Sequence, residues 1–285
     1  MKHIITITSL LAAGTILANA FTDTVWTFDG TTASTGVSVA GAFADSATSG
    51  AATSASYVDS TLGIGTKFGS YELTASLGQA IDLGTTQRVT TAGSAYWGNG
   101  DGALKIGSGA QSFTLITYVN FDSVAGEQFI FGTGSNHGAG LAFGLNNGRL
   151  DLLAKSKAHY NLTSSVTFST GTWYNLAVSY DAALGIATFY VDGADVGQIG
   201  SLASVACDNG GGAASAFGSA SSDSQQGNFA GLIAEFQILS GAKTQAEILS
   251  AAHLTASVPE PSVFGLLAGL GALALAGTRR RRRKA

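Results

Sequence analysis

The sequence predicts an all-β fold in which two antiparallel sheets pack together as a jelly-roll sandwich. Three observations predict it: short stretches alternate between apolar and polar residues, turns rich in the 39 glycines separate them, and one convincing helix signal follows the last stretch. Many closely spaced strands with a single helical turn near their end are typical of this architecture.

The first strand is predicted at residues 24–29. A long stretch of Ala, Ser, Thr and Gly follows at 30–60, and its composition favours loops and weak edge strands. The pattern becomes sharper at residue 112. Residues 112–121 have the two-residue period of a half-buried strand, with one face formed by Phe113, Leu115, Val119 and Phe121.

The remaining strands follow at short intervals. They are predicted at 128–131, 141–145, 149–154, 173–180, 186–191, 195–198 and 229–239. Asn147-Gly148 and Asp192-Gly193 separate neighbouring strands, and such residues tolerate the positive φ of a tight hairpin turn. The one helix begins at Thr244-Gln245-Ala246-Glu247, a capping box in which the hydroxyl and the carboxylate satisfy free backbone N–H groups.

Three blocks of sequence resemble laminin G-like, concanavalin A-like jelly rolls, and they occur in the family's order. They are GTWYNLAVSYD at 171–181, ATFYVDG at 187–193 and FAGLIAEFQI at 229–238. The resemblance is best supported over 112–252, and the residues up to about 109 are expected to supply the remaining strands. It implies a binding domain for sugars or proteins, often with calcium at a rim.

The calcium ligands of that family are only partly matched. Residues 134–138 contain no carboxylate where a laminin G domain usually has an aspartate, and Ala234 stands where many relatives have Asp. A loop site at Asp101 is the remaining expectation, against the alternative that Asp101 ends a turn. For ligand contact, Tyr96 and Trp97 form an aromatic pair beside a Gly-rich loop, whereas Trp173 is expected to pack in the core.

Catalysis is not expected. A glycosidase needs two carboxylates that face the sugar, and here Glu235 stands alone on its strand, although acids far apart in sequence can meet in the fold. Asp192 and Asp195 bracket a turn. The histidines at 137, 159 and 253 have no partner in sequence and are expected to be surface or turn residues, and the common hydrolase, metalloprotease and nucleotide-binding motifs are absent.

Both ends of the chain carry targeting signals. A basic start, an apolar stretch at 4–17 and the cleavage site Ala18-Asn19-Ala20 predict a signal peptide over residues 1–20. At the other end, Pro259-Glu260-Pro261 precedes an apolar helix at 262–278 and six basic residues at 279–284. At about 1.5 Å per residue this helix reaches only ~25 Å, a short membrane span.

This tripartite end resembles the PEP-CTERM sorting signal of Gram-negative bacteria. The resemblance implies that residues 258–285 hold an exported protein in the inner membrane until an exosortase recognises Pro259-Glu260-Pro261 and removes the tail. Signal peptidase and exosortase would then be processing partners. The basic residues would stay in the cytoplasm and the body outside it, in accord with the positive-inside rule.

The net charge of the residues between the two terminal signals restricts the kinds of molecule that the protein can bind. Residues 21–257 carry seven Lys and Arg against seventeen Asp and Glu, a net charge of −10. Such an acidic body argues against nucleic acid, and it disfavours anionic polysaccharide unless a cation bridges the two. Cys207 is the only cysteine, so the chain forms no internal disulfide.

Together these observations predict an exported, exosortase-processed protein of the cell surface or of an extracellular matrix such as a biofilm. Its jelly roll, residues 21–257, is expected to bind a carbohydrate such as an exopolysaccharide, or another partner. Two alternatives remain open at this stage: a structural matrix protein without a specific ligand, and a concanavalin A-like polysaccharide lyase or hydrolase.

Overall fold

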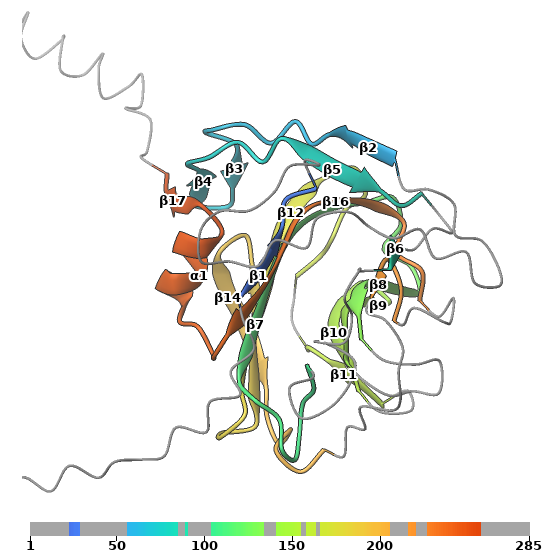
Figure 1. Ribbon diagram of the computed structural model, residues 1–285, viewed down its shortest axis with the longest axis vertical. Coiled ribbons are helices and arrows are strands. Elements are labelled where there is room, and N and C mark those ends of the chain that lie inside the picture. Colours follow the sequence, from blue (N-terminus) through green and yellow to red (C-terminus); the bar gives the residue numbers. More distant parts are fainter. Residues whose placement is uncertain are drawn as a thin grey trace, which may run out of the picture.

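The computed structural model describes residues 23–28, 56–84, 89–90, 104–133, 141–154, 158–163, 166–205, 216–220 and 227–257. Within these ranges the chain forms three antiparallel sheets and one helix. The largest sheet, sheet A, lies in the middle (Figure 1). Sheet B covers one of its faces, and the small sheet C with helix α1 covers the other, so the molecule has the antiparallel sandwich that the sequence predicts.

Sheet A has eight strands in the order β14-β13-β12-β7-β16-β5-β2, with β1 paired to β16 beside this path. All of its pairings are antiparallel. Its strands are β1 (Thr24–Trp26), β2 (Ser56–Asp59), β5 (Gln79–Asp82), β7 (Phe113–Phe121), β12 (Trp173–Asp181), β13 (Ile186–Val191), β14 (Ala194–Ile199) and β16 (Gly231–Ser240).

Sheet B has six strands in the order β11-β10-β9-β8-β15-β6. They are β6 (Val89–Thr90), β8 (Glu127–Gly132), β9 (Leu141–Asn146), β10 (Arg149–Ala154), β11 (Ala158–Asn161) and β15 (Ala216–Phe217). Sheet C joins the end of the described chain to its first third, in the order β17-β4-β3. It consists of β3 (Lys67–Phe68), β4 (Tyr71–Leu73) and β17 (Leu254–Ala256), and α1 (Gln245–Ala251) precedes β17.

The main core fills the space between sheets A and B. The four residues that the alternation assigns to one face of β7 all belong to it, which confirms the prediction for this strand. Aromatic rings form its centre: Trp26 packs edge-on against Phe217, with ring centroids 5.4 Å apart, and Phe131 and Phe236 pack at 4.7 Å. Residues from the first, middle and last parts of the chain therefore share one core.

A second core joins the other face of sheet A to sheet C and α1. Phe68 of sheet C packs edge-on against Tyr118 of β7, and Ile248 of α1 is buried in the same cluster. Trp173 packs against this cluster, as expected from the sequence. The capping box of α1 is confirmed, because Thr244 accepts a hydrogen bond from the Glu247 N–H while the Glu247 carboxylate accepts one from the Thr244 N–H at 2.8 Å.

The predicted turns also form. Asn147 and Gly148 have φ values of 50° and 74°, and Asp192 and Gly193 have 52° and 75°, so both hairpins use the left-handed region as expected. Gly231 opens β16 at a point where this strand runs unusually close beside its neighbour β7. A Cβ atom there would lie 2.0 Å from the Asn120 carbonyl oxygen, which is why this position requires glycine.

The two terminal signals lie outside the described residues: residues 1–20 with Ala18 and Ala20, and residues 258–285 with Pro259, Glu260 and Pro261. Tyr96, Trp97 and Asp101 lie outside them as well. Within the described part of the chain, no helix has the length and apolar character needed to cross a membrane.

Candidate functional site

The outer face of sheet B, which points away from the main core, carries a cluster of polar side chains. Because side chains alternate along a strand, β10 directs Leu150 and Leu152 into the main core and turns Asp151 to the outer face. The pairing of the neighbouring strands places further polar residues around Asp151. We call this set the His159 cluster, and it consists of Glu127 in β8, Asn146 in β9, Asp151 in β10, and His159 and Asn161 in β11.

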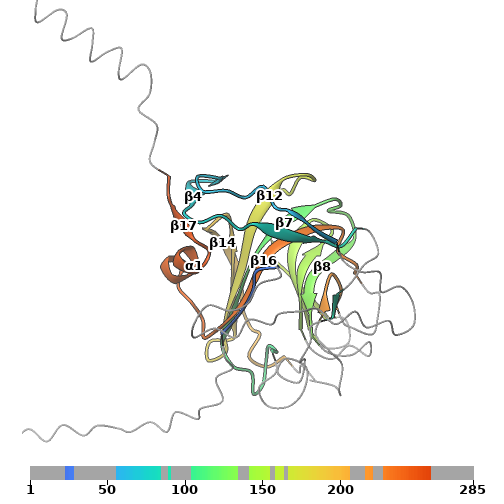
Figure 2. The same ribbon diagram turned by 45° about the horizontal axis from the view of Figure 1, so that its top comes forward.

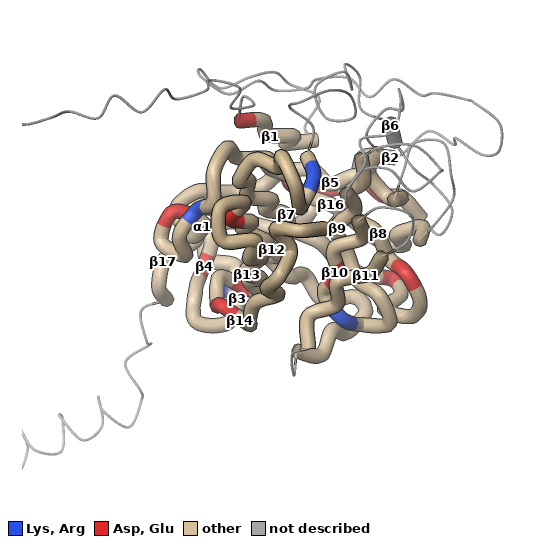
Figure 3. The backbone as a smooth tube through the Cα atoms, turned by 90° about the horizontal axis from the view of Figure 1, so that it is seen from below, with Lys and Arg blue, Asp and Glu red and all other residues tan. Residues whose placement is uncertain are grey.

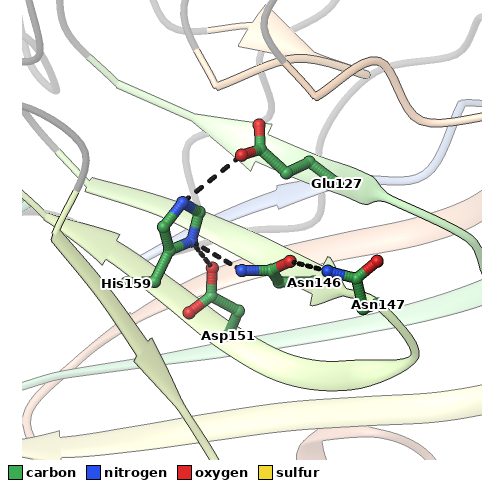
Figure 4. Close-up of polar contacts among 5 residues, drawn as sticks. All are labelled: Glu127, Asn146, Asn147, Asp151 and His159. Atoms are coloured by element: carbon green, nitrogen blue, oxygen red, sulfur yellow. Dashed lines mark hydrogen bonds and ion pairs between the residues drawn. The ribbon is translucent and has the colours of Figure 1, made fainter.

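Histidine 159 lies at the centre of this cluster (Figure 4). Its Nδ1 atom is 2.6 Å from Oδ2 of Asp151, and its Nε2 atom is 3.3 Å from Oε1 of Glu127. The Asn146 amide nitrogen lies 3.1 Å from Nδ1, and the ring stacks on Phe129. The expectation that His159 is an unpaired surface or turn residue is therefore wrong, because strand pairing brings two distant carboxylates to it.

The protonation of the imidazole decides how many of these contacts are hydrogen bonds. A neutral ring has one N–H and can donate to one carboxylate, whereas an imidazolium has two and can donate to both. The ring of His159 faces Asp151 with one nitrogen and Glu127 with the other. The cluster can therefore hold a proton between two carboxylates that are 24 positions apart in sequence.

Asp151 is fully enclosed, with 0% of its side chain exposed, while His159 and Glu127 are 22% and 31% exposed. Burial raises the pKa of the Asp151 carboxyl, and the hydrogen bond with His159 offsets part of that rise. A backbone hydrogen bond from the Tyr160 N–H lowers the same pKa as well. His159 thus engages Oδ2 of Asp151, while Oδ1 is buried and has no partner in strict hydrogen-bond geometry.

Two buried acceptors of the cluster have no donor. They are Oδ1 of Asp151 and Oδ1 of Asn161. The two residues are direct cross-strand partners, so their side chains lie on the same face with Cβ atoms ~5 Å apart. Buried polar atoms are normally paired, so two neighbouring exceptions point to a missing donor.

Two further acids, the buried Glu235 and the half-buried Asp192, lie on the opposite side of sheet A. Glu235 accepts a hydrogen bond from Gln237 Nε2 at 2.6 Å, and Asp192 Oδ1 accepts one from the Asn175 N–H at 3.0 Å. Burial raises the pKa of both carboxyls, that of Asp192 to about 6. The hydroxyl of Tyr118 donates to the Ala252 carbonyl beside them. Because α1 and sheet C enclose this region, these acids belong to the packing of the layers.

Several residues singled out in the sequence remain to be placed. His253 is exposed and has a φ of 54°, as expected for a turn residue. Residues 134–138 with His137, and Cys207, lie outside the described residues together with Tyr96, Trp97 and Asp101. In the described ranges, no group of three or more His, Cys, Asp and Glu is arranged to hold a metal ion. The calcium expectation at Asp101 therefore stays untested.

Comparison with known proteins identifies the family. The sequence profile of the concanavalin A-like lectin/glucanases superfamily matches residues 84–249, which is more than half of the chain. The chain therefore belongs to this superfamily, in agreement with the resemblance seen in the sequence. No curated protein matches it.

Solved structures with similar folds include three proteins of different origin. A heptameric SAP-like pentraxin from Limulus polyphemus is 13% identical, with 50% of this chain and 70% of that chain covered and a TM-score of 0.41. Domain 4 of an extracellular arabinanase from Geobacillus stearothermophilus, solved with arabinotriose, is 18% identical, with coverages of 70% and 87% and a TM-score of 0.44. A leech intramolecular trans-sialidase is 16% identical, with a TM-score of 0.45, and the match covers 62% of this chain and 27% of that chain.

Proposed function

We propose that this protein binds a carbohydrate and that the His159 cluster contacts the glycan. The observation that carries the proposal is the pair of buried acceptors without donors, Asp151 Oδ1 and Asn161 Oδ1, in a cluster whose other members are partly exposed. Membership of a superfamily of lectins and glucanases supports it. Sugars present many hydroxyl groups, and carboxylates, amides and imidazoles are the side chains that pair with them.

The contents of the cluster suit binding better than catalysis. In this arrangement both ring nitrogens of His159 face carboxylates, so the imidazole is engaged by the cluster and not poised as a base toward a substrate. Glu127 and Asp151 approach opposite ends of the imidazole and not a shared space for a glycosidic bond (Figure 4). We therefore propose a binding module and not a lyase or hydrolase.

We also propose that the protein is exported and then sorted to the cell surface or matrix. The signal peptide at 1–20 and the Pro259-Glu260-Pro261 tail support this proposal. If an exosortase removes the tail, a Glu260→Gln variant should accumulate as an uncleaved, membrane-retained form, whereas Ser262→Ala should be processed normally. Western blots of membrane and released fractions would check this, and normal processing of Glu260→Gln would contradict the sorting proposal.

Glycan binding is tested with the purified full-length chain and a panel of polysaccharides that includes the exopolysaccharide of its own source, with calcium and with EDTA. We expect saturable binding that falls by about 10- to 100-fold in Glu127→Gln, since hydrogen bonds to charged groups contribute about 1.5–3 kcal/mol each. Asp195→Asn is the matched control, because Asp195 lies in β14 at the far edge of sheet A.

Four results would decide between the alternatives. If the affinity is unchanged in Glu127→Gln, the glycan binds elsewhere on the protein. Loss of binding in EDTA would add a calcium requirement. Self-association without saturable binding to any polysaccharide would favour the structural alternative. Release of shorter products from a polymer would show that the protein is an enzyme and would overturn the proposal.

A further inference from the structure

We propose that the His159 cluster binds its glycan through a protonated amine, so that the ligand is a polymer of amino sugars with free amino groups. This inference rests on the proposed function and names the ligand class of the same site. It follows from the number of hydrogens that the unpartnered acceptors require and from the charge around them.

The first step concerns the hydrogens. Asp151 Oδ1 and Asn161 Oδ1 are both acceptors, both are buried, and both lack a donor. They are cross-strand partners on one face, so a single small group between them can reach both. A sugar hydroxyl has one hydrogen and satisfies one acceptor, whereas an ammonium group has three and satisfies both with one to spare.

The second step concerns charge. Glu127 and Asp151 both have an oxygen within 3.3 Å of His159, and when both carboxyls are ionised a single imidazolium balances only one of the two charges. Water or a hydroxyl would leave the second charge uncompensated in a partly buried place, whereas an ammonium group neutralises it. Hydrogen bonds from an ammonium to a carboxylate are also about twice as strong as those between neutral groups.

The surroundings favour a cation as well. Figure 3 shows that basic residues are few and widely spaced along the described chain. Arg149 and Lys157 are the cations nearest in sequence, two positions before Asp151 and two before His159. Arg149 is exposed, so solvent screens its charge, and Lys157 lies outside the described residues. Among the described residues no ion pair links Arg149 to Glu127 or Asp151. The net charge of −10 over 21–257 attracts polycations and repels polyanions.

The third step is access. The unpartnered oxygen of Asp151 is buried, whereas His159, which contacts the other oxygen of the same carboxyl, and Glu127 are both partly exposed. Partly exposed side chains change rotamer rapidly, so the imidazole can swing away while an ammonium group takes the place of its Nδ1–H on Asp151. The amine would thus replace the Nδ1–H of His159 as a donor to Asp151 and supply the hydrogens that Asp151 Oδ1 and Asn161 Oδ1 lack.

One competing explanation needs no ligand. If Asp151 holds a proton in the folded protein, its own hydroxyl can donate to Asn161 Oδ1. If the Asn161 amide is turned by 180°, its Nδ2–H donates to Asp151 Oδ1 instead, and in either case the two residues satisfy each other. In that case Asp151→Asn, which keeps an N–H donor beside Asn161, would leave glycan binding unchanged. The experiment must therefore separate a bound amine from this internal hydrogen bond.

The test is isothermal titration of the full-length chain with three hexamers of one size: glucosamine, N-acetylglucosamine and glucose, at a pH at which the amines carry charge. We expect the glucosamine hexamer to bind at least about 10-fold more tightly than the other two, which matches a charge-assisted pair of hydrogen bonds. Asp151→Asn should remove this preference and Asn161→Leu should reduce it, whereas Asp195→Asn should leave it unchanged. Melting temperatures identify any variant that fails to fold.

Each other outcome counts against a defined part of the proposal. Equal affinity for the three hexamers, lost in Glu127→Gln, would keep the glycan site and overturn the amine. A preference that survives in a folded Asp151→Asn variant would overturn the role of Asp151 and favour its internal hydrogen bond. Methylamine that binds as tightly as the glucosamine hexamer would show that the site takes a free amine and no glycan. Failure of all hexamers and of the polysaccharide panel would overturn the proposed function itself.

Discussion

At the residue scale, three carboxyl groups, the buried Asp151 and Glu235 and the half-buried Asp192, are expected to shape the response of this protein to pH. Burial is the largest cause of the raised pKa in Asp151, Asp192 and Glu235. A raised pKa means that the folded protein holds the proton more tightly than the unfolded chain does. The stability that each contributes is therefore complete below its ordinary pKa and is lost as the pH rises through the raised value.

Asp192 offers the clearest test of this effect. Its pKa rises from 3.8 to about 6, so the wild-type protein loses stability across that interval. Asp192→Asn keeps the acceptor for the Asn175 N–H and suits the positive φ of the turn, while it removes the buried charge. We expect the variant to be about 1–2 kcal/mol more stable at neutral pH, after allowance for partial exposure.

Urea unfolding at several pH values would check this prediction. The two proteins should have equal stability at a pH well below 3.8, where Asp192 is protonated in both the folded and the unfolded state. A variant that is less stable than the wild type at neutral pH would show that the carboxylate is a favourable acceptor and that its burial costs little.

The cluster around His159 shows what a single sequence cannot predict at this scale. The residues Glu127, Asp151 and His159 are all visible in the sequence, and the possibility that distant acids meet was part of the expectation. Their meeting depends on the register of three strand pairs, β8 with β9, β9 with β10, and β10 with β11. A shift of one residue in any of them would turn a side chain to the other face.

At the scale of elements, long strands were predictable and short ones were not. The strands at 173–181 and 186–191 and the capped helix follow from alternation, turn residues and the capping box. Two-residue strands such as β3 and β15 are too short to show a period. No strand was predicted at β11 either, because the alternation of AHYN covers only four residues and follows a polar stretch, and that is where His159 lies.

Gly231 provides a prediction for strand β16. In Gly231→Ala the new Cβ atom would stand 2.0 Å from the Asn120 carbonyl oxygen of β7, at a φ of +138° that other residues rarely adopt. Because β7 and β16 are neighbours at the centre of sheet A, neither backbone can move aside easily. We expect a loss of about 2–4 kcal/mol in the free energy of unfolding.

Gly63→Ala is the matched control for this experiment. A Cβ atom at Gly63 would have nothing within 4 Å, and its φ lies outside the positive range. The control should change stability by less than about 1 kcal/mol. Denaturant unfolding of both variants would check the prediction, and equal stabilities would mean that β16 can move away from β7.

At the scale of the whole molecule, the acids combine into a pH profile. Asp151, Asp192 and Glu235 all favour the folded state at acidic pH, whereas the exposed Glu247 has a lowered pKa and acts in the opposite direction. We expect the melting temperature to be highest on the acidic side of neutrality. Melting curves between acidic and neutral pH would check this, and a profile that rises steadily to neutral pH would contradict it.

The layers also place two regions of proposed function, the glycan site and the segment that leads into the sorting tail, on opposite sides of sheet A. Sheet B with the His159 cluster lies on one side of sheet A, and α1 with β17 lies on the other (Figure 2). The superfamily and the sandwich were predictable from three sequence blocks and from strand alternation. The side of the sandwich that holds the polar cluster was not, because it depends on which strands pair at the edge of sheet B.

The last described residues have a mechanical consequence. Strand β17 is joined to β4 by three residue pairs, and the Ser257 N–H adds a hydrogen bond to the Ser70 carbonyl at 2.9 Å. If the tail that follows is fixed in a membrane, tension on the chain reaches this three-stranded sheet first. Sheet C would then separate first, and the sandwich beyond it would stay folded and keep any ligand that it has bound.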